Sequence, residues 1–131
     1  MLAIGILSKR TGVNIETIRY YERIGLLPIA QRSENGRRFY RDEDTRRLKF
    51  VRHSRELGFD LAAIRSLLAL QETPDASCAQ VTSIAQAQLT TVEERLRRLS
   101  ALRDELARIT AECAGGRVAE CRIIETLETG A

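Results

Sequence analysis

Three cysteines, Cys78, Cys113 and Cys121, are the residues of this 131-residue chain whose type and spacing could do chemistry. An odd number of thiols does not suit a disulfide framework, so metal ligation and free thiols are the alternatives. Cys113 and Cys121 flank a loop in which Gly115 and Gly116 let the backbone fold back. Two thiolates at such a loop suit a soft metal ion, although they could also form a disulfide switch, and a lone cysteine could simply be a small buried residue.

A long helix is expected between the first two cysteines. The 36 residues from Ser77 to Glu112 contain no Pro or Gly, and as a helix they would be about 54 Å long. A coiled-coil seam, with steps that alternate between three and four, is occupied by Val81, Ala85, Val92, Leu99, Leu102, Leu106 and Ile109. Gln88 and Arg95 stand at two positions of this seam and interrupt its apolar pattern. The chain has no second long helix to cover this seam, so the pattern predicts a homodimer with antiparallel helices.

The spacing of the cysteines connects them to this dimer. Cys78 and Cys113 are 35 residues apart, which is five heptads, so they lie on one stripe of the helix about 52 Å from each other. They cannot meet within one chain. In an antiparallel dimer, Cys78 of one chain comes near Cys113 of the other, and Cys121 follows Cys113 by eight residues. We therefore predict a site with three thiolates that two chains share.

The first part of the chain has the pattern of a helix-turn-helix. An apolar-periodic segment over residues 4–11 ends at Gly12, and Asn14 is a natural N-cap for a second helix that closes before Gly25. On this second helix we expect Ile15 and Ile18 to face inward. The positions predicted to face outward are Glu16, Thr17, Arg19 and Tyr20.

A basic hairpin is predicted directly after the helix-turn-helix. The pair Asn35-Gly36 is a strong hairpin signal, because a tight turn there needs positive φ at both positions. Basic and aromatic residues flank it, namely Arg32, Arg37, Arg38, Phe39 and Tyr40. A basic hairpin in this place is typical of a wing that grips DNA phosphates.

Two more helices complete the expected fold, one from Asp42 to about Leu57 and one after Asp60 that ends before Pro74. The fold class is mainly α, a winged helix-turn-helix DNA-binding domain over residues 1–74. A coiled-coil dimerisation helix follows over residues 75–112, and a metal-binding loop with a C-terminal tail over residues 113–131. In the tail we expect a short amphipathic turn from Ile123 to Leu127 that packs over the loop.

Charge and composition narrow the classes of function. Residues 1–55 carry 13 Lys and Arg against 6 Asp and Glu, whereas residues 56–131 carry 8 against 12, which favours a polyanionic partner for the first part. No apolar run approaches the roughly 20 residues of a membrane span, and the opening MLAIGIL does not look like a signal peptide. We expect a cytoplasmic protein without membrane contact. The sequence places no pair of carboxylates, no His–Cys pair and no phosphate-binding loop, so nothing in it indicates an enzyme.

The residues described above resemble the MerR family of bacterial transcription regulators, in its metal-responsive branch. The opening IGILSKRTGVNIETIRYYERIGLL matches the family's helix-turn-helix, SENGRRFY its wing and RELGFDLAAIRSLL its second helical pair. The spacing of the three cysteines matches that of the family's metal ligands. The resemblance implies a homodimer that distorts double-stranded promoter DNA when metal binds, so that RNA polymerase can engage the promoter.

The resemblance also implies which residues contact DNA. By motif position these are Thr17, Arg19, Tyr20 and Tyr21 of the second helix, with Arg38 and Tyr40 of the wing. Arg32 joins them as a basic residue of the same hairpin.

Features of the resemblance point to two classes of metal ion. The third thiolate, Cys78, adds charge and a coordination position that suit a divalent ion, where the copper branch has Ser. Relatives dedicated to zinc carry further Cys or His residues around the loop, which leads us to cadmium, lead or mercury, with zinc as a further candidate. The seven-residue gap between Cys113 and Cys121 resembles the copper branch, so a sensor of copper(I), silver or gold is the alternative. A thiol redox sensor is the third interpretation.

Overall fold

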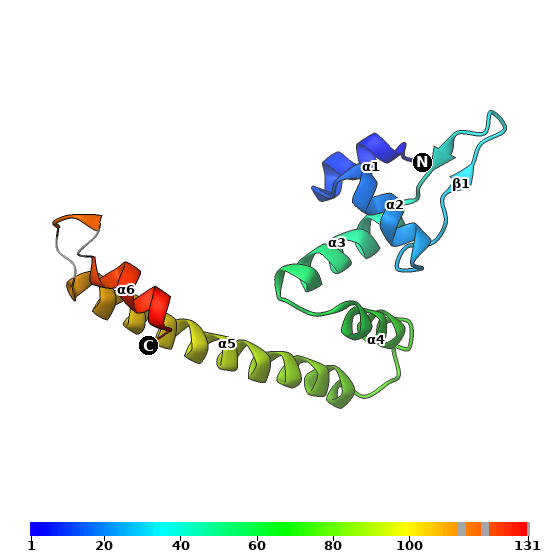
Figure 1. Ribbon diagram of the computed structural model, residues 1–131. Coiled ribbons are helices and arrows are strands. Elements are labelled where there is room, and N and C mark those ends of the chain that lie inside the picture. The colour runs from blue at the N-terminus through cyan, green and yellow to red at the C-terminus, as the bar shows by residue number, and fades with distance from the viewer. Residues whose placement is uncertain (113–114, 119–120, 131) are drawn as a thin grey trace. The chain divides into compact units, whose positions relative to one another are not determined.

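The structure is a computed structural model that describes residues 1–112, 115–118 and 121–130. The chain divides into two compact units, Met1–Ile84 and Ala85–Ala131, which we call the N-terminal and C-terminal units. The described elements are mostly helical, as Figure 1 shows, so the mainly α fold is confirmed. None of the helices described is long and apolar enough to cross a membrane.

The helix-turn-helix forms where it was predicted. Helix α1, Ile4–Thr11, ends at Gly12, which has a φ of 72° and donates its backbone N–H to the Ser8 carbonyl. A side chain would be strained at this φ, and an added Cβ would also strike the Arg52 guanidinium. Helix α2, Ile15–Arg23, begins after Asn14, whose side chain accepts a hydrogen bond of 2.7 Å from the Glu16 N–H.

Packing of α2 differs from the prediction at one residue. Ile18 is fully buried, as expected, but Ile15 is 37% exposed. Ile15 is the first residue of the helix, and Val13, in the turn before it, is buried in the core instead. The inward orientation predicted for Ile15 is therefore wrong.

The wing is a two-stranded antiparallel hairpin of β1, Gln31–Arg32, and β2, Arg38–Phe39, with Arg32 opposite Arg38. Its turn is not the tight turn expected at Asn35-Gly36. Gly36 has a φ of 77°, but among the described residues every residue with positive φ is a glycine, so Asn35 does not share this conformation. The Ser33 N–H donates to the Arg37 carbonyl, which leaves a three-residue loop that ends on a left-handed glycine.

Two further helices cover the helix-turn-helix. Helix α3, Asp42–Glu56, and helix α4, Leu61–Gln71, are each capped as predicted by an acidic side chain near the start. The Asp44 carboxylate accepts from the Arg41 N–H and that of Asp60 accepts from the Ala63 N–H, both at 2.8 Å. The core formed with α1 and α2 includes Leu7, Ile18, Leu48, Val51 and Ile64.

Arginines of α3 and α4 connect these helices to the helix-turn-helix. Arg52 donates to the Thr11 carbonyl at the end of α1, at 2.5 Å. Arg47 donates to the Leu26 carbonyl at 2.7 Å, and Arg65 donates to that of Ile24, both just after α2. These guanidinium groups satisfy carbonyls that the ends of α1 and α2 leave free.

Helix α5, Cys78–Glu112, has 35 residues and begins after Ser77, whose hydroxyl accepts from the Ala79 N–H. Most of its predicted seam is exposed in the single chain, including Leu99, Leu102 and Leu106. In the C-terminal unit these leucines line an apolar groove of about 570 Å³.

The tail of the C-terminal unit is helix α6, Arg122–Thr129, which lies beside the last turns of α5 (Figure 1). The Arg122 guanidinium is 3.9 Å from the Glu112 carboxylate. Ile109 of α5 is buried, but Leu127 of the tail is 71% exposed, so the expected packing of Leu127 is wrong for the single chain. Ile123, at the start of the same helix, is half-buried, so the tail packs at its beginning and not at Leu127.

Candidate nucleic-acid interface and metal centre

The outer face of α2 presents two basic residues and one aromatic residue, Arg19, Arg23 and Tyr20. Arg19 and Tyr20 are exposed, and the Arg23 guanidinium lies 5.8 Å from the centre of the Tyr20 ring. Such a cation–π contact restricts the ring and leaves its edge free for a partner. Arg23 was not among the predicted residues, although its spacing of three from Tyr20 on a helix could have indicated the pair.

The wing adds two more cations. Arg32 and Arg38 face each other across the hairpin and are both exposed. Arg32 also donates to the Gly36 carbonyl at 3.1 Å, which ties its side chain to the loop. Two guanidinium groups on a short hairpin form a surface that can bind phosphate oxygens.

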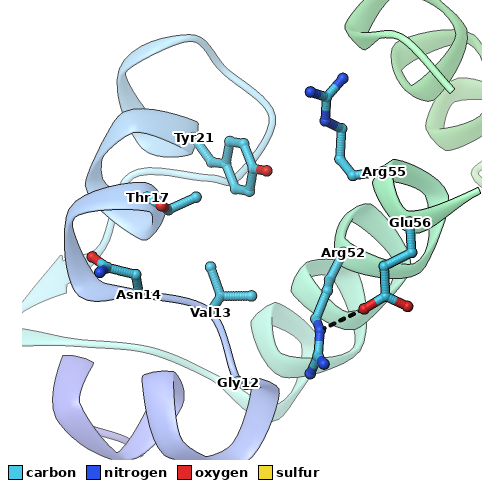
Figure 2. Close-up of a pocket in the computed structure, with 8 residues that line it drawn as sticks. All are labelled: Gly12, Val13, Asn14, Thr17, Tyr21, Arg52, Arg55 and Glu56. Atoms are coloured by element: carbon cyan, nitrogen blue, oxygen red, sulfur yellow. Dashed lines mark hydrogen bonds and ion pairs between the residues drawn. The ribbon is translucent and has the colours of Figure 1, made fainter. Parts of the chain in front are cut away.

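Thr17 and Tyr21 lie on another side of α2, facing a hollow of about 410 Å³ between the helix-turn-helix and α3. Figure 2 shows their side chains across this hollow from Arg52 and Arg55, and Arg52 is paired with Glu56 at 3.0 Å. Thr17 is half-buried and Tyr21 is buried. The full lining comprises Gly12, Val13, Asn14, Thr17, Tyr21, Arg52, Arg55 and Glu56.

Tyr40, which immediately follows the second strand of the wing, lies in the core. It is fully buried, and its hydroxyl donates a hydrogen bond to the Glu22 carboxylate. Burial, with this hydrogen bond and the charge of Glu22, raises the pKa of Tyr40 far above its ordinary value. Its backbone also exchanges two hydrogen bonds with Leu2. The DNA contact predicted for Tyr40 stays a prediction. In the structure its ring packs in the core and its hydroxyl bonds to Glu22, which gives this side chain a structural role.

The predicted set therefore separates into three groups. The exposed members are Arg19, Tyr20, Arg32 and Arg38, which carry three guanidinium groups and one phenol. Thr17 and Tyr21 face the hollow, and Tyr40 lies in the core. Chemically, the exposed group can neutralise phosphates and donate to base edges.

Two of the three cysteines, Cys78 and Cys121, lie at the boundaries of helices. Cys78 is the first residue of α5 and is exposed, and Cys121 is the N-cap of α6 and is half-buried. Cys113 lies outside the described residues. Within one chain, the residues that the structure describes form no group of three His, Cys, Asp or Glu side chains that could hold a metal ion. Cysteine thiolates are the donors that soft metal ions prefer.

Family models match most of the chain. Residues 2–71 match the model described as MerR HTH family regulatory protein, and residues 45–109 match the model described as MerR, DNA binding. Together these ranges cover the helix-turn-helix, the wing and nearly all of α5.

Individual relatives match over nearly the full length. The transcriptional regulator HmrR of Rhizobium leguminosarum bv. viciae is 42% identical, over 98% of this chain and 98% of its own. The solved structure of PbrR691 from Ralstonia metallidurans CH34 in complex with lead(II) is 35% identical, with a TM-score of 0.81 over 97% of this chain and 99% of its own.

MerR from Bacillus megaterium MB1, solved in complex with mercury(II), is 31% identical with a TM-score of 0.72, over 97% of this chain and 99% of its own. This protein is therefore similar to metal-responsive regulators, and its relatives are transcription regulators and not enzymes. The chain belongs to the MerR family of helix-turn-helix transcription regulators.

Proposed function

We propose that this protein binds promoter DNA as a homodimer and activates metal-resistance genes when a thiophilic divalent metal ion binds its cysteines. The DNA half of the proposal is supported by the exposed Arg19 on α2 and by Arg32 and Arg38 on the wing. With α2 as the recognition helix in the major groove, the wing would lie over the neighbouring phosphates.

The observation that carries the metal half is the position of Cys78. It is the exposed first residue of a 35-residue helix whose apolar stripe, with Leu99 and Leu106, is uncovered. An antiparallel partner helix that covers this stripe would bring its own far end to Cys78, because 35 residues are five heptads. Cys113 and Cys121 follow that far end. We propose that these three thiolates from two chains hold the ion.

Three thiolates favour a divalent soft ion, which here would be cadmium, lead, mercury or zinc. The similar structures solved with lead(II) and mercury(II) support this choice. When bound, the ion would hold the two chains together at each site. Because a ligand shifts a conformational equilibrium only by its differential affinity, metal must favour one dimer shape. That shape would distort the promoter so that RNA polymerase can engage it.

Copper(I), silver or gold is the second candidate, and the seven residues between Cys113 and Cys121 favour it. Two thiolates would suffice for a monovalent ion, so Cys78 would not take part. The two candidates thus differ in their dependence on one exposed residue.

The first experiment titrates the reduced protein anaerobically with cadmium and, separately, with copper(I), and follows thiolate-to-metal charge-transfer absorbance. The variants are Cys78→Ser and the control Ala79→Ser, which changes the adjacent residue of α5. We expect the cadmium signal to saturate at one ion per site, to survive in the control and to collapse in Cys78→Ser. Tight copper(I) binding that Cys78→Ser leaves unchanged would instead establish the monovalent sensor. No signal with either ion, together with DNA binding that responds to oxidants, would establish the redox sensor.

A second experiment tests whether two chains share the site. Chains carrying Cys78→Ser are mixed with chains carrying both Cys113→Ser and Cys121→Ser, and the heterodimers are purified by two tags. Each chain alone lacks a complete thiolate set, but the heterodimer regains one complete site out of two. We expect half of the parent's cadmium absorbance in the heterodimer and none in either variant homodimer. Absence of any recovery would rule out sharing between chains.

A further inference from the structure

Glu22, near the end of α2, connects the recognition helix to the wing. Its Oε1 accepts the hydrogen bond from the Tyr40 hydroxyl, and its Oε2 lies 3.6 Å from the Arg38 Nη1. The Glu22 side chain is only 8% exposed, whereas that of Arg38 is 40% exposed. One carboxylate therefore holds a core residue with one oxygen and a surface cation of the wing with the other.

A carboxylate in this place carries an electrostatic cost. It lies on the helix that would enter the groove, where negative charge opposes DNA phosphates. It is also largely desolvated, which is unfavourable for a charge without partners. Interactions with its two partners, Tyr40 and Arg38, must offset this cost, and they indicate what Glu22 does.

The Tyr40 side of the contact is rigid. Tyr40 is fully buried, and its backbone N–H and carbonyl both bond to Leu2, at 2.7 and 2.8 Å. Glu22 is thus fixed by a residue that immediately follows β2, Arg38–Phe39, at the base of the wing. A hydrogen bond in which the acceptor is ionised is stronger than a neutral one.

The ion pair with Glu22 orients the exposed side chain of Arg38. Arg38 lies directly opposite Arg32 in the hairpin, and like charges across a strand pair repel each other. Without an anion nearby, the two guanidinium groups would turn apart. The Glu22 carboxylate offsets this repulsion and restricts the Arg38 side chain to the side of the wing that faces α2.

We propose that Glu22 is a positioning residue, which fixes the wing against the recognition helix and aims Arg38 at DNA. This inference rests on the proposed DNA binding. It makes an unusual prediction, that removal of a negative charge from the DNA-binding surface weakens binding to the operator.

The test compares Glu22→Gln with Glu16→Gln, which removes the same charge from the exposed first turn of α2. The probe is a duplex that the parent protein selects from a random-sequence library, with an unselected duplex as the reference, and affinities are measured by fluorescence anisotropy. We expect Glu16→Gln to raise the affinity for both duplexes, because repulsion of phosphate falls. We expect Glu22→Gln to lower the affinity for both duplexes, by about tenfold for the selected one, because a wing guanidinium that binds phosphate contributes to either duplex.

A mutant cycle with Arg38→Ala separates positioning from general destabilisation. If Glu22 acts through Arg38, Glu22→Gln has no further effect once Arg38 is alanine. The proposal is overturned if Glu22→Gln raises affinity as Glu16→Gln does, or if its effect persists in the Arg38→Ala background.

Amide hydrogen exchange of the free protein tests the wing without DNA. In Glu22→Ala, which loses both contacts, the Ser33 and Tyr40 amides should exchange about tenfold faster than in the parent. Glu22→Gln keeps an acceptor for Tyr40 and should restore slow exchange at Tyr40, while Glu16→Ala should leave both amides unchanged. Unchanged exchange in Glu22→Ala overturns the proposal. If the parent selects no duplex, the proposed function is wrong, whereas the exchange result still decides whether Glu22 fixes the wing.

Discussion

The two units of the chain use similar aliphatic residues with opposite outcomes. In the N-terminal unit, Leu48 and Ile64 are fully buried among helices of the same chain. In the C-terminal unit, Leu99 and Leu106 are 62% and 60% exposed. The difference shows that the first unit can close its core alone, whereas the second has an apolar face that its own chain does not cover.

The contrast predicts a different dependence of stability on protein concentration for the two units. A core that closes within one chain has a stability independent of protein concentration. A helix whose apolar face is covered only by a second copy gains its stability by mass action. The comparison therefore predicts that the two units respond differently to substitution and to dilution.

The largest effect should come from a charge placed on the uncovered stripe of α5. Leu102→Asp would bury one unpaired carboxylate per chain in a dimer interface, and self-association should weaken on the order of a thousandfold. Ala101→Asp, which adds the same charge at an exposed position beside the seam, is the control. Sedimentation equilibrium measures both. Equal dimerisation of the two variants would mean that this stripe is not the interface.

A truncation in the core of the N-terminal unit should have the next largest effect. Ile18→Ala removes a fully buried side chain of α2 and should lower the free energy of unfolding by about 3 kcal/mol. Ile29→Ala, at a residue that is 83% exposed, should change it little. Chemical denaturation at several protein concentrations provides the measurement. A loss in Ile18→Ala that grows on dilution would contradict the independence of this unit.

The smallest effect concerns pH and the contact between Tyr40 and Glu22. Because the pKa of Tyr40 is raised by folding, its contribution to stability is complete below about pH 10 and is lost as the pH rises further, when the unfolded chain ionises first. The loss should be of the order of 1 kcal/mol between pH 10 and 11. Tyr40→Phe should be less stable at neutral pH and should lack this part of the alkaline decline. If the free energies of unfolding of the parent and of Tyr40→Phe fall in parallel with pH, Tyr40 has the same pKa in the folded and the unfolded chain, and the prediction is wrong.

Local signals in the sequence predicted the elements well. Gly12 ends α1, Asn14 caps α2, and Asp60 caps α4, each where the sequence indicated. These features depend on the φ of one residue or on a side chain that reaches a backbone N–H two or three positions away. The absence of Pro and Gly similarly predicted the extent of α5.

Residues whose role depends on distant neighbours were harder to predict. Tyr40 was expected to contact DNA from its motif position in the resemblance to the family, but the local pattern did not indicate that its ring occupies the core beside Glu22. Glu22 itself was not singled out, because its partners are 16 and 18 residues further along the chain.

Local patterns along the chain were thus enough to predict the order of the helices, their ends, the apolar stripe of α5 and the spacing of the three cysteines. Which side chains around α2 and the wing remain exposed became clear only from the packing of the elements. Ile15 stays partly on the surface, whereas Val13 and Tyr40 are buried. The physical reason is that helix caps and periodicity are set by near neighbours in the chain. Burial depends instead on how separate elements pack, which the local pattern does not contain.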